Sequence, residues 1–577
     1  MQQIPLTAEQ ASIVSSPAWM RVVIAHPGTG KTHTLAAAVA DDLSRGVPPD
    51  SIVATTFTRA AAAELSARIE RYASGVGGNG ILVCTWHALA RLIVDRYGGA
   101  GLVAGRRVRI YDDFDVESLI RETCFALKVK PGPVIDKAAL IWSTDALEML
   151  PFEIRRPLGV VRDSMKSEGA LDQEGLIYEA AEVLRRDPAQ RSYWAWRARN
   201  LYVDEVQDFT HAEHVLLGAI KWVRLCAVGD PAQNLYEWRG AIVRGIEILA
   251  ETARSSGGAV FSLTGCFRTG EAIVRGFWNP CRERIEPGSK QTESLRLLPP
   301  GIENPMASAT WKESAADQND ELGRLVKDAH GDVCILARTH DSLNRAIDFC
   351  AAVGIRVVRL ERSRLWDGAG ARFVRYMMRL LFDADDPAAR RGFAFCVATA
   401  NLPRRETALR ETLPKVGPLI EMGPIWAWFR EFAPELLRFG AGWALTEVAG
   451  IAARCGRDLG KTVERLSEPA HVGETPPVPE DPFAQTWVYA GTVHAAKGLE
   501  WPTVVLWDLS PNVWPRVAKN SAGACAERRV LYVGGTRARD RLEIIGAVRL
   551  DAANKPEKSW LLEETLEGFA SVAGREE

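Results

Sequence analysis

The sequence contains no apolar run long enough to cross a membrane. No uninterrupted apolar stretch reaches about 18 residues, the length that marks a candidate transmembrane helix. The N-terminal residues MQQIPLTAEQASIV also lack the basic and then apolar pattern of a secretory signal. These absences predict a cytoplasmic protein that makes no membrane contact.

Paired cysteines and an excess of basic residues are missing as well. The ten cysteines, such as Cys84, Cys226 and Cys334, are scattered without the paired spacing of a zinc site, so we expect reduced thiols. The formal net charge is only −2, whereas a nucleic-acid binder often shows a basic imbalance. This near-neutral charge counts mildly against a function in nucleic-acid binding. A protein that repeatedly releases a strand, however, needs a local groove of donors and aromatic rings rather than a globally positive surface.

The length and the hydrophobic pattern predict several domains. With 577 residues the chain is too long for one hydrophobic core, so three or four domains are expected. Short apolar runs alternate with helical patterns, which predicts α/β domains with parallel sheets. Two mostly helical stretches interrupt this alternation, and the second ends in a segment rich in Pro and Glu that is typical of a linker.

The simplest account is two α/β domains, each divided by a helical insertion. No internal repeat or low-complexity tract complicates this division. The expected boundaries are 1–94 and 198–270 for the first domain, 95–197 for its insertion, 271–382 and 484–577 for the second domain, and 383–483 for the second insertion with its linker.

A phosphate-binding loop is indicated near the N-terminus. AHPGTGKT (25–32) follows the apolar run RVVIA and opens a helical pattern, the context that such a loop requires. Gly28 and Gly30 would allow the backbone to wrap a phosphate. Lys31 would neutralise its charge, and Thr32 would ligate Mg²⁺. The loop begins with Ala rather than Gly, and the alternative is a glycine-rich turn with an accidental GKT.

An acidic pair ends the next clear strand pattern, in VDEVQD (203–208). Asp204 is placed to hold Mg²⁺, directly or through water, and Glu205 to orient and deprotonate an attacking water. Taken alone, the pair is equally well explained by a solvated turn. Together with the upstream loop it predicts ATP hydrolysis.

The segment AVGDPAQNLYEWRGA (227–241) carries groups suited both to a nucleotide and to bases. Gln233 is an uncharged amide that could sense the γ-phosphate. Trp238 is followed by Arg239, with Tyr236 nearby, and stacking of a base on an aromatic ring contributes about 1–3 kcal/mol with any base. The alternative, that both aromatic residues are buried core residues, stays open.

Nine segments together resemble, in order, the motifs of the UvrD/Rep helicases of superfamily 1. The resemblance covers both α/β domains, is weak through the helical insertions, and implies two RecA-like P-loop domains that use ATP and Mg²⁺ to move along single-stranded DNA from 3′ to 5′. The segments are LTAEQ (6–10), AHPGTGKT (25–32), TFTRAAAAEL (56–65), CTWHAL (84–89), VDEVQDFT (203–210), GDPAQNLYEWRGA (229–241), LTGCFRT (263–269), TVHAAKGLEW (492–501) and ERRVLYVGGTRARDRL (527–542).

The resemblance implies a nucleotide site. Gln10 would recognise the adenine, Phe267 would stack on it, and Glu500 would contact the ribose. Arg268 and Arg537 resemble the two γ-phosphate arginines, which stabilise charge in the transition state. The implied catalytic groups are Lys31, Glu205, Gln233, Arg268 and Arg537, with Thr32 and Asp204 for the metal. The implied nucleotide contacts are Gln10, Ala25, His26, Pro27, Gly28, Thr29, Gly30, Lys31, Thr32, His33, Phe267, Arg268, Glu500 and Arg537.

The resemblance also implies a track for DNA. For two of its histidines, His87 and His494, a packed and hydrogen-bonded core role stays open beside a DNA contact. The implied positions are Phe57, Thr58, Thr85, His87, Tyr236, Trp238, Arg239 and His494.

Several positions depart from the family pattern. His26 occupies a position where the family usually has Gly, and His33 one where an arginine often contacts the nucleotide. Phe267 replaces the usual Tyr and keeps a stacking face. The insertion at 383–483 is short for the family, which puts duplex engagement in doubt, and few residues follow the last motif, so we expect no fused nuclease domain.

We therefore expect an ATP-dependent DNA helicase that binds single-stranded DNA and junctions of single- and double-stranded DNA. One rival is a translocase that removes bound proteins without processive unwinding. A rival of another class is a DNA-binding protein that uses ATP only as a switch. Protein partners and the pathway, whether DNA repair, replication restart or replication of a mobile element, stay open.

Overall fold

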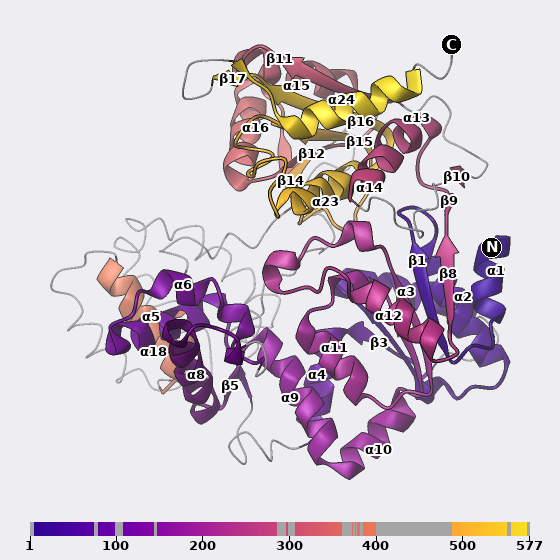
Figure 1. Ribbon diagram of the computed structural model, residues 1–577, viewed down its shortest axis with the longest axis vertical. Helices are drawn as coiled ribbons and strands as arrows, with labels where there is room; N and C mark the ends of the chain where they lie inside the picture. Colours follow the sequence, from indigo (N-terminus) through magenta and orange to yellow (C-terminus); the bar gives the residue numbers. More distant parts are fainter. Residues whose placement is uncertain are drawn as a thin grey trace, which may run out of the picture.

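The computed structural model contains two α/β bodies, with a helical body beside the first (Figure 1). The described residues are 5–73, 79–97, 108–143, 147–285, 296–297, 306–329, 331–360, 372, 375–376, 378–380, 383, 385–399, 487–550 and 556–573.

The first sheet has six parallel strands and is buried on both faces. In spatial order these are β3 (Leu82–Thr85), β2 (Ile52–Thr56), β6 (Asn200–Val203), β7 (Arg224–Gly229), β1 (Met20–Ala25) and β8 (Ala259–Leu263). Within β1, Val22 and Ile24 enter one apolar core, whereas Val23 and Ala25 enter another. Burial on both faces explains why the sequence shows continuous apolar runs here rather than alternation.

Helices cover both faces of this sheet. One face packs against α1 (Ala8–Ser15), α2 (Lys31–Ser44) and α3 (Arg59–Tyr72). The opposite face packs against α4 (Trp86–Arg96), α11 (His211–Ala219) and α12 (Gly245–Ser255).

The second sheet is also parallel and six-stranded. In spatial order its strands are β11 (Met306–Lys312), β16 (Ala538–Ala547), β15 (Trp501–Trp507), β12 (Val333–Ala337), β14 (Val488–Thr492) and β13 (Val357–Arg359). Two parallel sheets flanked by helices confirm the expected fold class. We had no expectation for β8, β11 or β14.

Helices cover this sheet on both sides as well. One face packs against α15 (Ala315–Asp328) and α16 (His340–Ala352). The other packs against α14 (Asn279–Ile285), α23 (Ala524–Gly535) and α24 (Trp560–Ala573). A short π-helix, η6 (Val274–Trp278), joins α13 (Glu271–Ile273) to α14. Helix α14 contacts both α23 and α24.

A helical body lies between α4 and β6 in the sequence, where the first insertion is expected. Its helices are α5 (Asp113–Leu127), α6 (Pro131–Ile135), α8 (Phe152–Ser167), α9 (Gln173–Arg186) and α10 (Pro188–Arg197), with a short strand pair, β4 (Arg109–Ile110) and β5 (Ala170–Leu171). The side chains of Asp112, Asp172 and Asp187 cap the N-termini of α5, α9 and α10. Because α9 packs against α4 and α11, the insertion shares its core with the first sheet.

Helix α18 (Pro387–Thr399) belongs to the region expected as the second insertion. It lies against α5 of the helical body (Figure 1). Arg391 on α18 pairs with Glu168 at 2.6 Å, and the nearby Arg379 pairs with Asp115 at 2.7 Å. Residues 400–486, and therefore most of the expected insertion and its linker, lie outside the described residues.

Two absences apply to the described part of the chain. No helix there combines the length and the apolar character needed to span a bilayer. The described cysteines are free thiols, and most of them are buried.

The close contact between α23 and the π-helix η6 gives a stability prediction. A Cβ at Gly535 would lie 2.0 Å from Cε1 of Phe277, whose side chain is fully buried. We expect Gly535→Ala to destabilise the protein by about 1–3 kcal/mol, because overpacking displaces the ring. The control is Gly218→Ala in α11, where no atom lies within 4 Å of the added methyl group. Thermal unfolding checks both variants, and equal unfolding temperatures would contradict the packing argument.

Candidate active site between the two sheets

The carboxyl ends of the strands of the first sheet face a cleft, and the amino ends of β15 and β16 of the second sheet border it on the other side. A cavity of about 610 Å³ opens there between the two sheets. Ligands of open parallel sheets bind at such carboxyl ends. The first sheet contributes Pro27, Gly28, Gly30, Lys31, Thr32, His33, Phe57, Thr58, Asp204, Glu205, Gln233 and Tyr236 to the lining, the connecting segment Phe267 and Arg268, and the second sheet Lys497, Gly498, Leu499, Glu500, Trp501 and Arg537.

The phosphate loop requires glycine at two positions for both conformation and space. Gly28 has φ +69° and Gly30 has φ +82°, in the left-handed region. A Cβ at Gly28 would lie 2.5 Å from the Cβ of Arg268, and one at Gly30 would lie 2.7 Å from Nε2 of Gln10. Helix α2 begins at Lys31, so its N-terminal amides face the cavity, as an anion site needs.

The Lys31 ammonium fits a bound phosphate. Its side chain is mostly buried, and its Nζ lies 4.0 Å from Oε1 of Glu205. No hydrogen-bond acceptor among the described residues reaches this Nζ. A buried ammonium without an acceptor is costly, and phosphate oxygens would satisfy it.

The acidic pair follows β6 in an unusual backbone conformation. Glu205 has φ +57°, and its N–H donates to Oδ1 of Asp204 at 3.0 Å. Burial, together with the Glu205 charge, raises the pKa of Asp204 to about 7. Burial also acts to raise the pKa of Glu205, but Lys31 and Lys497 more than offset it and lower that pKa to about 2.

These side chains fit a magnesium ion. Burial and the Glu205 charge raise the pKa of the Asp204 carboxyl although Lys31 opposes them, so a further cation would stabilise its charged form, and Thr32 lines the same cavity. Within the described ranges, no group of three His, Cys, Asp or Glu side chains is arranged to hold a metal. A magnesium ion here would therefore take its oxygen ligands from Thr32, Asp204, phosphate and water.

Arg537 reaches the cavity from the second sheet. Its side chain is buried, and Nη2 donates to Oε1 of Gln233 at 3.1 Å. Nε and Nη1 donate to the carbonyls of Val533 and Leu499. Burial and the neighbouring Arg268 lower the pKa of Arg537 to about 9, which marks a guanidinium that is short of anions. A terminal phosphate would supply the missing charge.

Arg268 lies at the same cleft but is held by the second sheet. Its Nε pairs with Oε2 of Glu500 at 2.8 Å, and Nη1 donates to the Thr536 carbonyl at 3.1 Å. Next to it, Phe267 is 46% exposed, and its N–H donates to the Gly28 carbonyl at 2.8 Å. The Phe267 ring thus offers an open face beside the phosphate loop, as the predicted stacking on adenine requires.

Other predicted nucleotide residues support the loop. Gln10 is buried, and its Nε2 donates to the Thr29 carbonyl at 3.1 Å while its Oε1 accepts from the Thr7 N–H at 3.0 Å. Both ends of the amide therefore have partners. The His33 ring bonds the Tyr72 hydroxyl, and burial lowers the pKa of His33. The adenine role of Gln10 and the ribose role of Glu500 stay predictions.

Three of the residues predicted to contact single-stranded DNA form an aromatic cluster: Phe57, Tyr236 and His494. The Phe57 and Tyr236 rings stack with centroids 4.7 Å apart, and the His494 ring meets Tyr236 edge-on at 6.2 Å. Tyr236 is only 3% exposed and belongs to an apolar core that it shares with the second sheet. In the present conformation Tyr236 is therefore a buried core residue, as the alternative interpretation of its segment proposed.

The remaining predicted track residues lie on the first sheet and the segment after β7. The hydroxyls of Thr58 and Thr85 cap α3 and α4 by accepting from the N–H groups three residues on. Arg239 lies 3.4 Å from Nε2 of His87 and 3.9 Å from the Glu174 carboxylate. The Trp238 side chain lies outside the described part of the chain.

Lys497 is a residue of the cleft to which the sequence pattern assigned no role. Its buried ammonium pairs with Asp208 of the first sheet and donates to the Gln233 carbonyl at 3.1 Å. It also lies 5.1 Å from the centroid of the Tyr236 ring. Lys497 and Asp208 stand inside two of the matched motifs, which is the one signal that could have singled them out.

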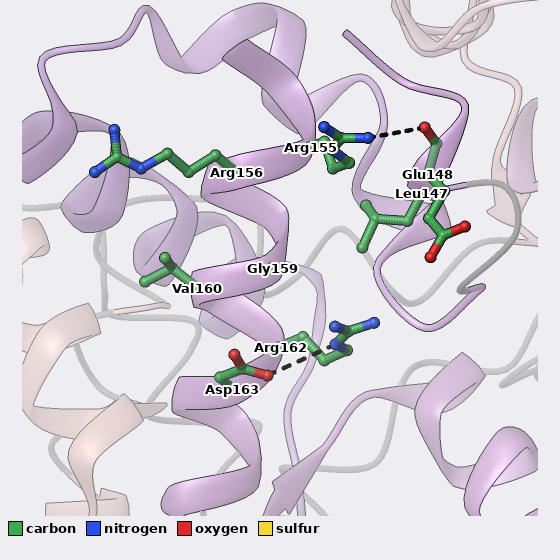
Figure 2. A pocket seen from close by; sticks show the side chains of 8 residues that line it. All are labelled: Leu147, Glu148, Arg155, Arg156, Gly159, Val160, Arg162 and Asp163. Carbon is green, nitrogen blue, oxygen red and sulfur yellow. Dashed lines mark hydrogen bonds and ion pairs between the residues drawn. The ribbon is translucent and has the colours of Figure 1, made fainter. Parts of the chain in front are cut away.

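A second cavity, of about 620 Å³, lies beside α8 of the helical body (Figure 2). Arg155 donates to the Glu148 carbonyl at 3.1 Å, and Arg162 lies 3.7 Å from Asp163. Figure 2 shows Arg156 extending to the side of the helix opposite Arg155. Because these cations do not converge and no glycine loop accompanies them, the cleft between the sheets is the candidate nucleotide site.

A phosphate loop and an acidic pair on one parallel sheet, completed by an arginine from a second, define a two-domain P-loop nucleotide hydrolase. Family models match this chain: the UvrD/REP helicase N-terminal domain over residues 6–147 and 154–254, and the UvrD-like helicase C-terminal domain over residues 484–549. Together they cover more than half of the chain. The chain therefore belongs to the UvrD/Rep helicase family.

Similar proteins align along nearly the whole chain. The ATP-dependent DNA helicase PcrA of Bacillus subtilis is 23% identical, over 91% of this chain and 80% of the relative. PcrA of Staphylococcus epidermidis is 23% identical, over 94% of this chain and 83% of the relative. The ATP-dependent DNA helicase UvrD1 of Mycobacterium tuberculosis is 24% identical, over 93% of this chain and 81% of the relative.

The space around Gly28 gives a test of the site. Gly28→Ala should raise the Kd for ATP about tenfold or more, because its methyl group would push Arg268 away from the loop, and each tenfold corresponds to about 1.4 kcal/mol. Gly46→Ala is the matched control, since Gly46 has φ +83° but no atom within 4 Å of the added carbon. Titration with a fluorescent ATP analogue measures both. The same loss of affinity in the two variants would contradict the explanation by the contact with Arg268.

Proposed function

We propose that this protein is an ATP-dependent DNA helicase that hydrolyses ATP between its two sheets and moves along single-stranded DNA from 3′ to 5′. The observation that carries the proposal is the contact of Arg537 with Gln233 across the cleft, beside the loop and the acidic pair of the first sheet. The names of the similar proteins, all ATP-dependent DNA helicases, support DNA as the substrate.

Each group at the cleft has a task in hydrolysis. The loop amides and Lys31 bind the phosphates, and a magnesium ion held by Thr32 and Asp204 would neutralise charge on the β- and γ-oxygens. Because the pKa of Glu205 is about 2, its carboxylate stays ionised at neutral pH and can orient the attacking water. Arg537 stabilises the charge that develops on the transferred phosphoryl group.

The same geometry couples hydrolysis to movement. Arg537 belongs to the second sheet, so a bound γ-phosphate draws the two sheets together, and its loss releases them. Lys497 joins the nucleotide side to the aromatic cluster, because it contacts both the Gln233 carbonyl and the Tyr236 ring. Opening and closing of the cleft therefore changes the surface on which bases stack, and alternate gripping by the two domains moves the strand.

Two substitutions separate binding from chemistry. Lys31→Ala should abolish turnover, since the ammonium neutralises phosphate charge. Glu205→Gln should keep ATP affinity but lower kcat by about 100-fold or more, because the amide cannot accept a proton from water. Glu70→Gln, an exposed carboxylate on α3, is the control with the same chemical change. ATPase rates with saturating single-stranded DNA and a separate binding titration measure the effects, and a Glu205→Gln variant with wild-type kcat would remove Glu205 from the mechanism.

Direction and unwinding are tested on two duplexes that differ only in the polarity of the single-stranded tail. We expect ATP-dependent strand separation from the 3′-tailed duplex and none from the 5′-tailed one. Hydrolysis stimulated by DNA without strand separation on either substrate would instead support a translocase that removes bound proteins. ATP binding with negligible turnover at saturating single-stranded DNA would support the ATP-switched binding protein.

A further inference from the structure

A buried ion pair lies behind the active site. Arg282 on α14 is 3% exposed, and its Nη1 lies 2.7 Å from Oδ1 of Asp230, which is fully buried. Arg282 does not line the cavity that holds Lys31 and Glu205. Because α14 packs against helices of the second domain and Asp230 follows β7, the pair joins the two domains. Buried ion pairs contribute little net stability, so this one invites another explanation.

The Asp230 carboxylate determines which end of the Gln233 amide faces it. Oδ2 of Asp230 accepts a hydrogen bond from Nε2 of Gln233 at 2.8 Å, while Oδ1 accepts from Arg282 and from the Ala232 N–H. An ionised carboxylate only accepts hydrogen bonds. The amide nitrogen of Gln233 must therefore point toward Asp230, and the amide oxygen must point away from it.

The opposite end of the amide meets Arg537. Oε1 of Gln233 accepts from Nη2 of Arg537 at 3.1 Å. A guanidinium only donates, so the amide lies between a group that can only accept and a group that can only donate. Gln233 is buried, and only one orientation satisfies both neighbours. Arg537 thereby keeps a fixed acceptor beside the phosphate loop.

Asp230 fixes this orientation only while its carboxyl group is ionised. Burial acts to raise the pKa of Asp230, but Arg282, Lys31 and His26 more than offset it and lower the pKa to about 2. Arg282 is the largest of the opposing influences. Without it the carboxyl group is more easily protonated, and a protonated Asp230 can donate to Gln233 as well as accept from it. Asp230 then no longer fixes the amide by itself, and only the contact with Arg537 determines its orientation.

We propose that Arg282 is a positioning residue for ATP hydrolysis: by pairing with Asp230 it holds the amide oxygen of Gln233 toward Arg537. The inference rests on the proposed ATPase function. Arg282 contacts no reacting atom and acts through two intermediate side chains, so its removal should change kcat and leave ATP affinity nearly unchanged.

A double-mutant cycle tests whether Arg282 acts through Gln233. Arg282→Met should lower the DNA-stimulated kcat by about 10- to 100-fold, the loss expected when a group near the chemistry is misplaced. Gln233→Ala removes the amide itself. In the Gln233→Ala background, Arg282→Met should have no further effect, within about twofold, because the group that it positions is gone. If the double variant loses kcat by the product of the two single losses, the two effects are additive in free energy and the inference is overturned. A wild-type kcat in Arg282→Met would also overturn it.

Further variants exclude a merely structural role. Arg282→Lys keeps the charge and should retain kcat within about threefold, whereas Arg282→Gln keeps a hydrogen-bond donor but no charge and should behave as Arg282→Met. If Arg282→Met does not fold, the cycle is measured with Arg282→Gln. Unfolding temperatures accompany every rate, and a variant that loses stability while its kcat does not depend on Gln233 would overturn the proposal.

Wild-type protein separates this inference from the proposed function. If wild-type protein hydrolyses no ATP with saturating single-stranded DNA, the proposed function fails. If wild-type protein is active and the cycle with Gln233 is additive, only the role of Arg282 fails.

Discussion

The contact of the Arg537 guanidinium with the Gln233 amide joins the two sheets across the cleft, and the rest of the site depends on it. Arg537 donates to the Gln233 oxygen, to the carbonyls of Leu499 and Val533 and to the Thr536 hydroxyl, but within the described chain it forms no ion pair with a carboxylate. A buried cation held only by neutral acceptors is an incomplete ion pair. In the proposed function the terminal phosphate completes it, so substrate binding and closure of the cleft are one event.

A second contact between the two sheets, the ion pair of Lys497 with Asp208, lies beside the aromatic cluster. Burial raises the pKa of Asp208 to about 6 even though Lys497 opposes it, so the pair is sensitive to any movement that separates its partners. If the sheets part after hydrolysis, both charges must be solvated or find new partners, and breaking a buried pair on one side alone costs about 3–5 kcal/mol. Water entering the open cleft offsets that cost. Opening the nucleotide site thus also wets the aromatic cluster beside Lys497.

The local parts of this structure could be predicted from the residues themselves, whereas a long-range grouping such as Lys31 with Arg537 was predicted only through the family resemblance. Strands such as β1 and β12 are continuous apolar runs because both faces of their sheets are buried, and a phosphate loop is one short segment with a required context. β11 and β14 contain small and polar residues that interrupt such runs, and we had not expected either. Asp208 and Lys497 are 289 positions apart, and only the relative placement of the two sheets brings them together.

The burial of Tyr236 is compatible with a role in stacking bases. In the present conformation its ring already stacks on Phe57, and an aromatic pair contributes about 0.5–1.5 kcal/mol beyond its burial. A DNA base stacked on an aromatic ring contributes about 1–3 kcal/mol. Because these energies are similar, a base could replace Phe57 at Tyr236 with a small net change in free energy once the cleft opens. A motor needs such near-balance, since a base held much more tightly than the partner it displaces would arrest the strand.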